Sequence, residues 1–224
     1  MMATKTRLLV GRSARKHRAI IKAARATFLA KGYDDTSVDE IAAIAAVSKP
    51  TIYKHFGDKV GLFGATIATA IAEAKSHTQA TIEALPATRN LEGDLRRFAR
   101  QHLAEVMQPH LLRMRRRLIA EAERFPQLAA TWYRNGPEKG HATLAAVFSA
   151  LAARGLLQID DALVAAEQFN WLVLIPLNRA MFITRSVNKR DLDRAADRAV
   201  DIFLAAYGSK SRETAVGCAS DVRS

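Results

Sequence analysis

A short segment of the chain combines hydrogen-bond donors, an aromatic ring and positive charge without a carboxylate. Its polar members are Lys49, Thr51, Tyr53, Lys54 and His55. Side chains of these types donate to phosphate oxygens and base edges, and a surface without Asp or Glu does not repel a polyanion. We therefore expect this segment to contact nucleic acid. Lys49 and Thr51 would lie near base edges or phosphates, and the other three would hold the backbone.

Two short helices joined by a tight turn must position this segment. Ser37, with a glutamate three residues on, has the spacing of a capping box, and apolar residues follow it at helical intervals. Ser48 can cap the second helix, and Pro50 falls in its first turn, where a missing N–H costs little. Asp58 can cap the third helix and places Lys59 within reach of the same phosphates. A solvated amphipathic helix pair is the alternative interpretation.

The composition favours helix and a polyanionic partner. The chain has 224 residues, of which nearly half are hydrophobic, with only 11 Gly and 6 Pro, and its formal net charge is +12. Between Lys5 and Lys31 there are nine Lys or Arg and no Asp or Glu. Such a charge indicates nucleic acid as a partner, although a solvated basic surface without a partner is the alternative. We expect the basic N-terminal arm to add phosphate contacts.

Membrane and enzyme classes find little support in the sequence. No apolar segment reaches the ~18 residues of a membrane span, no signal peptide is visible, and the single Cys218 cannot form an internal disulfide. We therefore expect a cytoplasmic protein. There is no nucleophile elbow, phosphate loop or zinc-protease motif, and the six His include no i,i+4 pair. We expect no enzyme activity, metal or cofactor.

The segment V-S-K-P-T-I-Y-K-H-F-G-D-K at 47–59 resembles the recognition-helix signature of the TetR/AcrR family of transcription regulators. The preceding T-S-V-x-x-I-A at 36–42 also matches. Ala46 stands where the family usually has Gly, so a less relaxed turn is expected, and Val60 replaces a common Glu. Two later segments, 119–137 and 151–169, resemble the C-terminal domain of the AefR-like subgroup.

The resemblance implies an all-α fold with an N-terminal three-helix helix-turn-helix DNA-binding head and a C-terminal helical ligand-binding and dimerisation bundle. We accordingly expect a disordered basic arm at 1–14, a DNA-binding domain at 15–60 with its motif at 37–56, an effector-binding and dimerisation domain at 61–207, and a disordered tail at 208–224. The expected DNA-contacting residues are Thr36, Ser37, Ser48, Lys49, Thr51, Tyr53, Lys54, His55 and Lys59.

Several features of the C-terminal part allow more than one interpretation. Gly61 and Gly64 begin the helix after the head, where they indicate close packing against the first helix or a compliant joint. The arginines at 113 and 115–117 indicate a solvated face with i,i+4 pairs, in preference to a second nucleic-acid patch. One long helix at 161–185 is expected to be kinked at Pro176. Gly136 and Pro137 are expected to end a helix.

A dimer is expected because the helix at 161–185 carries an apolar band too wide for one partner helix. A symmetric pair would also present two short recognition helices about 34–36 Å apart, matching a palindromic site. A buried helix in a monomer is the alternative. In the TetR family the last two helices form this interface, here about 161–185 and 189–207.

A small effector is also implied by the resemblance, and aromatic and Met side chains in the body can line its pocket or form core. The candidate pocket residues are His102, Met107, Met114, Leu118, Trp132, Phe148, Phe169 and Trp171, with Asn170 and Arg179 as further polar anchors. We thus expect a homodimeric repressor released from DNA by a small apolar molecule. The alternatives are a sequence-tolerant architectural DNA-binding protein and a small-molecule carrier with a vestigial head.

Overall fold

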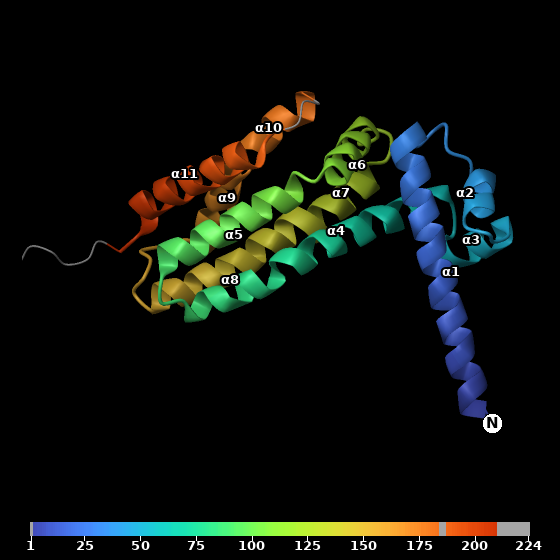
Figure 1. The fold of residues 1–224 in the computed structure, drawn as a ribbon, viewed down its shortest axis with the longest axis horizontal. Helices are drawn as coiled ribbons and strands as arrows, with labels where there is room; N and C mark the ends of the chain where they lie inside the picture. Colours follow the sequence, from blue (N-terminus) through green and yellow to red (C-terminus); the bar gives the residue numbers. More distant parts are fainter. Residues whose placement is uncertain (1, 184–186, 210–224) are drawn as a thin grey trace, which may run out of the picture.

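The computed structural model of the chain describes the backbone of residues 2–183 and 187–209, and the side chains of 13–73, 78–183 and 187–209. Within these ranges the regular elements are helices, with one isolated bridge between Leu157 and Gly208. The all-α prediction is therefore confirmed. Figure 1 shows a small head at one end of an elongated helical body.

The head contains α1 (Met2–Lys31), α2 (Val38–Ile44) and α3 (Lys49–Phe56), and α4 (Lys59–Ala84) runs from it into the body (Figure 1). Its core is apolar and closed, because Ile20, Phe28, Ile41, Ile52 and Phe63 are at most 1% exposed. These side chains come from all four helices, so burial of their faces fixes how α3 sits on α1 and α2. A short 3₁₀ turn, Leu85–Ala87, ends α4.

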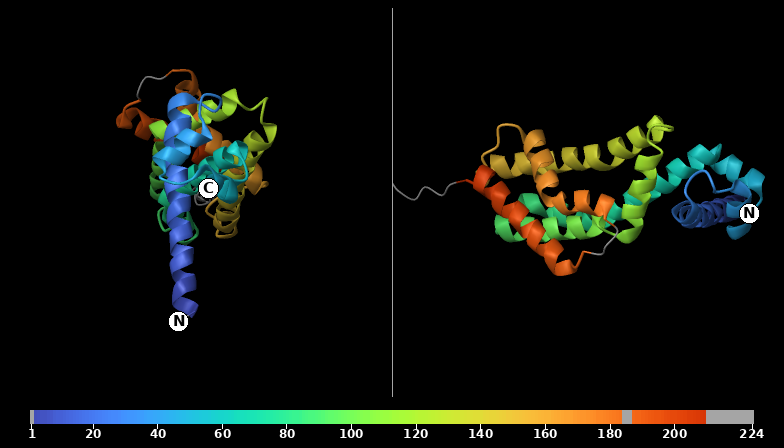
Figure 2. Two further views of the ribbon diagram at one scale, coloured as in Figure 1. Left: turned by 90° about the vertical axis from the view of Figure 1, so that its right-hand side faces the viewer. Right: turned by 90° about the horizontal axis from the view of Figure 1, so that it is seen from above.

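The N-terminal segment differs from the prediction. We expected residues 1–14 to be a disordered arm and the first helix to begin at Arg15, but α1 begins at Met2. The segment contains no Pro and is rich in Ala, Leu, Lys and Arg, which favour helix when a helix already lies downstream. Figures 1 and 2 show this half of α1 extending away from the rest of the molecule. We also expected Gly32 to end this helix. α1 stops at Lys31, and the φ of +89° at Gly32 suits a residue without a Cβ.

The body is formed by helices that run along its length and by shorter ones near the head. Its core is built on Phe98, Phe148, Phe169 and Phe203, each at most 4% exposed. In Figures 1 and 2, α4, α5 and α8 lie alongside one another, and α6 and α7 lie next to the head. The elements are α5 (Leu91–Val106), α6 (Pro109–Ala120), α7 (Pro126–Tyr133), α8 (Lys139–Ala153), α9 (Ala162–Val173), α10 (Ile175–Phe182) and α11 (Lys189–Tyr207).

Two breaks differ from those we predicted. The helix expected at 161–185 is interrupted: α9 ends at Val173 and α10 begins at Ile175, with Pro176 in the first turn of the new helix, where its missing N–H is tolerated. Gly136 and Pro137 do not end a helix; they lie in a π-helical turn, Arg134–Glu138, that connects α7 to α8. Most of the tail predicted at 208–224, and residues 184–186, lie outside the described residues.

Candidate DNA-binding surface and effector cavity

The entrance to the helix-turn-helix is capped at Ser37. Its Oγ accepts the backbone N–H of Glu40 at 3.0 Å, so this half of the predicted capping box is present. The Glu40 carboxylate instead pairs with Lys31 of α1 at 2.8 Å. Glu40 therefore pairs with Lys31 in place of the second bond of a capping box, which would run from its carboxylate to the backbone N–H of Ser37. This ion pair links α2 to α1.

The turn between α2 and α3 contains a strained residue. Ala46 has a φ of +52°, the left-handed region that favours Gly, and no other described non-glycine residue has a positive φ. The turn is held by N–H bonds from Ala46 to Ala43 O at 3.2 Å and from Val47 to Ala42 O at 3.0 Å. The prediction that Ala makes this turn less relaxed than Gly agrees with this conformation, which costs about 1–2 kcal/mol for a residue with a Cβ.

The recognition helix α3 begins after Ser48, as predicted, but Ser48 does not cap it with its side chain. Its hydroxyl bonds the Thr51 hydroxyl at 2.8 Å, because this partner one turn along competes with the backbone amides. Ile52 is completely buried and anchors α3 to the head core. Of the predicted contact residues, Lys49, Tyr53 and Lys54 are exposed, whereas Thr51 and His55 are half-buried.

Lys49 is a predicted contact whose charge is already paired with a carboxylate. Its ammonium lies 2.8 Å from the carboxylate of Asp39 on α2, and both side chains are exposed. The hydrogen bond and the charge of Asp39 raise the pKa of Lys49, so the ammonium remains charged. An exposed ion pair of this kind is weak, and a phosphate can replace its carboxylate partner.

The sequence interpretation missed His17 of α1. Its ring lies 4.9 Å from the ring of Phe56 and 6.0 Å from that of His55, measured between centroids, so it connects α1 with the end of α3. Its neighbours Arg15, Lys16 and Arg18 are exposed. The basic run was the only available signal, because no spacing within α1 indicates which turn meets α3.

Two of the residues predicted to contact DNA, Thr36 and Lys59, interact with the turn after α1. Thr36 is 2% exposed and donates its hydroxyl to the Gly32 carbonyl at 2.6 Å, so the prediction of a DNA contact by this side chain is wrong. It is buried because the turn after α1 needs a donor for that carbonyl. Lys59 donates to the Asp34 carbonyl at 3.1 Å and lies 4.5 Å from the centre of the Tyr33 ring. Its ammonium is therefore held at the turn that follows α1.

The two glycines of α4 support close packing rather than a compliant joint. A Cβ on Gly61 would lie 2.1 Å from the Phe56 carbonyl oxygen, and one on Gly64 would lie 3.1 Å from a methyl of Leu128. Their neighbours are the end of α3 and the body helix α7, not the first helix as expected. Gly64 thus marks a close contact between α4 and α7.

The arginines of α6 form the predicted solvated face only in part: Arg113 and Arg117 are exposed, whereas Arg115 and Arg116 are half-buried. Arg116 donates to the backbone carbonyls of Ala180 at 2.5 Å and Met181 at 3.1 Å, which satisfies the C-terminal end of α10. Arg115 turns inward and stacks on Trp132 at 4.9 Å from its ring centre. The sequence could not separate these roles, because consecutive residues on a helix face different neighbours.

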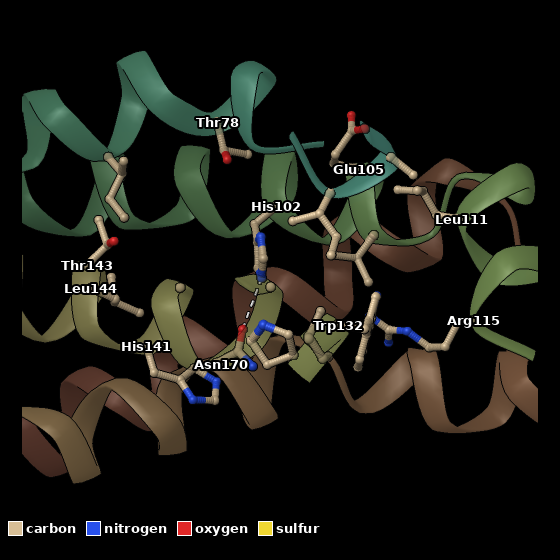
Figure 3. Close-up of a pocket in the computed structure, with 18 of the residues that line it drawn as sticks. Thr78, His102, Glu105, Leu111, Arg115, Trp132, His141, Thr143, Leu144 and Asn170 are labelled. Carbon is tan, nitrogen blue, oxygen red and sulfur yellow. Dashed lines mark hydrogen bonds between the residues drawn. The ribbon is translucent and has the colours of Figure 1, made fainter. Parts of the chain in front are cut away.

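A cavity of about 220 Å³ lies inside the body. It is partly open and is lined by residues of α4, α5, α6, α7, α8 and α9 together with the π-helical turn, and Figure 3 shows several of these residues converging on one space. Of the residues predicted to line a pocket, those in the cavity wall are His102, Met114, Trp132, Phe169 and the further anchor Asn170.

The other predicted pocket residues lie elsewhere. Met107, Leu118 and Phe148 are buried in the helical cores, where apolar contacts surround them. Trp171 is 62% exposed on the outer face of α9, one residue from Asn170 and therefore turned by about 100° around the helix. Arg179 is exposed on α10. Placing these residues in the pocket was wrong.

Polar side chains from several helices line the cavity, among them His102, Arg115 and Asn170. His102 Nε2 lies 3.0 Å from Asn170 Oδ1, shown as a dashed line in Figure 3. Burial lowers the pKa of His102, so the ring is neutral at pH 7 and its Nε2–H donates to the amide oxygen. Burial also lowers the pKa of Arg115 to about 10, which still leaves the guanidinium charged.

His141 of α8 is a further cavity residue that the sequence gave no reason to single out. It is 4% exposed, and its Nε2 is a buried side-chain atom without a hydrogen-bond partner among the described residues. Its Nδ1 lies 3.8 Å from a carboxylate oxygen of Glu167. Burial lowers the pKa of His141 although Glu167 opposes the shift, so the ring is neutral at pH 7.

The outer face of the C-terminal helices is apolar and exposed. Trp171, Ile175, Phe182 and Ile202 are 54–84% exposed. A groove between α9, α10 and α11 is lined by Leu172, Ile175, Ala195, Ala199 and Ile202, with Asp191, Arg194 and Arg198 also in its wall. A cluster of exposed large apolar side chains marks an interaction surface.

The described side chains, those of residues 13–73, 78–183 and 187–209, include no group of three or more His, Cys, Asp or Glu placed to hold a metal ion. Among the described helices, none combines the length and apolar character needed to cross a membrane.

A helix-turn-helix head with an exposed basic recognition helix, joined to a helical body, defines the class of DNA-binding transcription regulators. The sequence profile described as "Bacterial regulatory proteins, tetR family" matches residues 20–66, and that of the "AefR-like transcriptional repressor, C-terminal domain" matches residues 93–209. The chain belongs to the TetR family of transcriptional regulators, with an AefR-like C-terminal domain. It is therefore not an enzyme.

Known structures and a curated relative agree with this assignment. A TetR-family transcriptional regulator from Mesorhizobium loti MAFF303099 is 43% identical, with a TM-score of 0.84 over 88% of this chain and 98% of that one. The flavonoid-responsive regulator FrrA is 30% identical, with a TM-score of 0.73 over 88% of this chain and 100% of that one. The uncharacterized HTH-type regulator YdeS of Bacillus subtilis (strain 168) is 48% identical over 46 residues, which span 20% of this chain and 23% of that relative.

Proposed function

We propose that this chain is a cytoplasmic homodimeric repressor that binds a palindromic DNA operator and leaves it when a small effector enters the body cavity. The observation that carries this proposal is the exposure of Lys49, Tyr53 and Lys54 on a helix whose opposite side, at Ile52, is buried in the head. A surface of donors and cations without a carboxylate on the same helix suits insertion into the major groove.

The exposed face of α9, α10 and α11 supports the dimer. Four large apolar side chains, Trp171, Ile175, Phe182 and Ile202, lie at least half exposed on the last three helices. Burying such a face against a second copy is favourable by about 25 cal/mol per Å² of apolar surface. A two-fold axis there would also present two heads to one palindrome.

The cavity supports effector control. It is enclosed by α4, which continues directly into the head, and by α6, whose Met114 and Leu118 also pack in the head core. A molecule that displaces these helices would therefore change the spacing of the two heads. FrrA, which is similar over 88% of this chain, is described as flavonoid-responsive, and an aromatic effector is consistent with the Trp and Phe of this cavity.

Selection of bound sites from random double-stranded DNA tests the proposal. We expect an enriched palindrome bound at least ~10³-fold more tightly than scrambled DNA of the same length at the same salt concentration. If no sequence is enriched, the proposal that the chain recognises a specific operator is wrong. A half-site without its symmetric copy would contradict the dimeric mode.

The second candidate is a sequence-tolerant architectural DNA-binding protein. It is favoured by the net charge of +12 and by the basic helix α1, which do not depend on sequence recognition. A specificity ratio close to one in the same competition experiment would favour it. A carrier with a vestigial head would bind ligands without measurable affinity for any DNA.

A further inference from the structure

The cavity contains a positive charge that no anion in the described protein neutralises. Arg115 extends from α6 into the cavity and stacks on Trp132 at 4.9 Å, as Figure 3 shows. No described residue forms a hydrogen bond or ion pair with its guanidinium, and its pKa is affected by loss of hydration alone. Arg115 is half-buried. A charge that is partly withdrawn from water without a partner is costly, so pairing with an anion in the cavity would be favourable.

The two histidines of the cavity do not supply the negative charge that Arg115 lacks. His102 and His141 line the same cavity, and the positive charge of Arg115 opposes protonation of His102. His141 contributes a buried Nε2 without a partner. Because that nitrogen is closed off from solvent, the charge of Arg115 is the feature of the cavity with which a bound anion can pair.

Two carboxylates near this site do not neutralise Arg115. Glu105 lines the cavity but has an interaction of its own, and Figure 3 shows its carboxylate directed away from Arg115 and Trp132. Glu167 is half exposed and lies on the Nδ1 side of His141. An anion that pairs with Arg115 would therefore come from outside the described residues.

We propose that the effector is an organic acid, a largely apolar molecule whose carboxylate or phenolate pairs with Arg115 inside the cavity. This inference rests on the proposed effector control and narrows the effector to an anion. Much of the rest of the wall is apolar, including Ile67, Ile71, Phe98 and Leu144, and accepts a hydrophobic body, while Thr78, Gln79 and Thr143 add polar groups. A charge-assisted bond in such a site discriminates against a neutral analogue.

Three probes of the same shape test the charge requirement on the full chain. They are naphthalene-2-carboxylate, the neutral naphthalene-2-carboxamide and the cationic naphthalen-2-ylmethylamine, with binding measured by calorimetry at pH 7.5. We expect the carboxylate to bind at least tenfold more tightly than the amide, and the amine not to bind measurably. An amide or amine that binds as tightly as the acid would overturn the proposal, as would failure of all three at millimolar concentration.

Matched variants assign the preference to Arg115. Arg115→Met removes the charge but keeps much of the apolar length, and we expect acid and amide to bind it equally. Arg113→Met, at an exposed position of the same helix, should retain the wild-type preference. Arg115→Lys keeps a positive charge at the site and should retain part of the preference for the acid over the amide. This result would show that the loss of the preference in Arg115→Met comes from the lost charge and not from misfolding. Retention of the full preference by Arg115→Met would overturn the proposal.

Release from the selected operator separates this inference from the proposed function. If acid and amide release DNA equally well, effector control stands but the acid class is wrong. If the acid binds through Arg115 without releasing DNA, the site is correctly assigned and the proposed effector control fails.

Discussion

Arg124 and Asp34 form an ion pair that joins the turn after α6 to the turn after α1. The same junction contains Tyr33, whose ring centre lies 4.7 Å from that of Phe125, and Lys59, which donates to the Asp34 carbonyl at 3.1 Å. The DNA-binding head is therefore connected to the body at a second place besides the continuous helix α4. A displacement of α6 or α7 by a ligand has a direct route to the head.

Arg124→Gln should affect effector release more than stability. Both partners of the Arg124–Asp34 pair are more than half exposed, so we expect the free energy of unfolding to change little. DNA affinity without ligand should remain near wild type, while the ligand concentration for half-release should rise. Arg97→Gln removes an exposed pair within α5 and serves as the control in the same titration. Identical release curves for both variants would show that the junction does not transmit the signal.

Ala46→Gly should stabilise the head. Because Ala46 has a φ of +52°, removing its Cβ relieves the left-handed strain, partly offset by the entropy of Gly in the unfolded chain. We expect a gain of up to about 1 kcal/mol, measured from denaturant unfolding. Ala43→Gly, at an exposed position inside α2, should instead lose about 1 kcal/mol. If both variants lose stability equally, the turn is not strained.

Lys54→Met should weaken binding to all DNA sequences alike. Its ammonium is exposed on α3, so we expect it to contact phosphate rather than bases. Each lost contact reduces the slope of log K against log salt by about 0.9, and a dimer would lose two. Thr51→Ala should change base preference with a smaller effect on the slope. Lys139→Met, exposed on the body, is the control, and the prediction fails if Lys54→Met and Lys139→Met have the same slope.

Ile202→Glu should dissociate the proposed dimer. Ile202 is 54% exposed on α11 and shares a groove with Ile175, so a carboxylate there would be desolvated in a symmetric interface. We expect the mass of one chain by light scattering at micromolar concentration, and loss of affinity for the full palindrome. Ile119→Glu, at a 59% exposed position on α6, controls for added charge. A wild-type chain that already has the mass of one copy would contradict the dimer itself.

His141→Gln should reduce the loss of stability at mildly acidic pH. Burial lowers the pKa of His141 below its ordinary value of 6.5, so below about pH 6.5 the unfolded chain binds a proton that the folded chain does not. The wild-type free energy of unfolding should therefore decrease as pH falls from 7 to 5, and the decrease should be smaller in the variant. At pH 8 the His141 ring is neutral in both the folded and the unfolded wild-type chain. The difference in free energy of unfolding between wild type and variant at that pH therefore measures packing alone. Parallel curves for the two proteins would contradict the prediction.

The local features of the head could be predicted because their causes are local. The cap at Ser37, the first-turn Pro50, the cap at Asp58 and the end of α1 at Gly32 each depend on a residue and its near neighbours. Exposure of Lys49, Tyr53 and Lys54 followed from the positions of the apolar residues Val47, Ile52 and Phe56, which pack against the head core. The bounds of α11 were also predicted, since its apolar period is uninterrupted.

The sequence by itself determined the all-α fold, the helix-turn-helix and the family, because these depend on periodicity, capping and an ordered motif along the chain. Only the tertiary structure decided that Thr36 is buried, that Trp171 faces outward while Asn170 faces the cavity, and that neighbouring Arg115 and Arg116 serve different partners. A step of one residue turns a side chain by about 100° around a helix. Which neighbour it then meets depends on helices distant in the sequence, and local pattern contains no information about their placement.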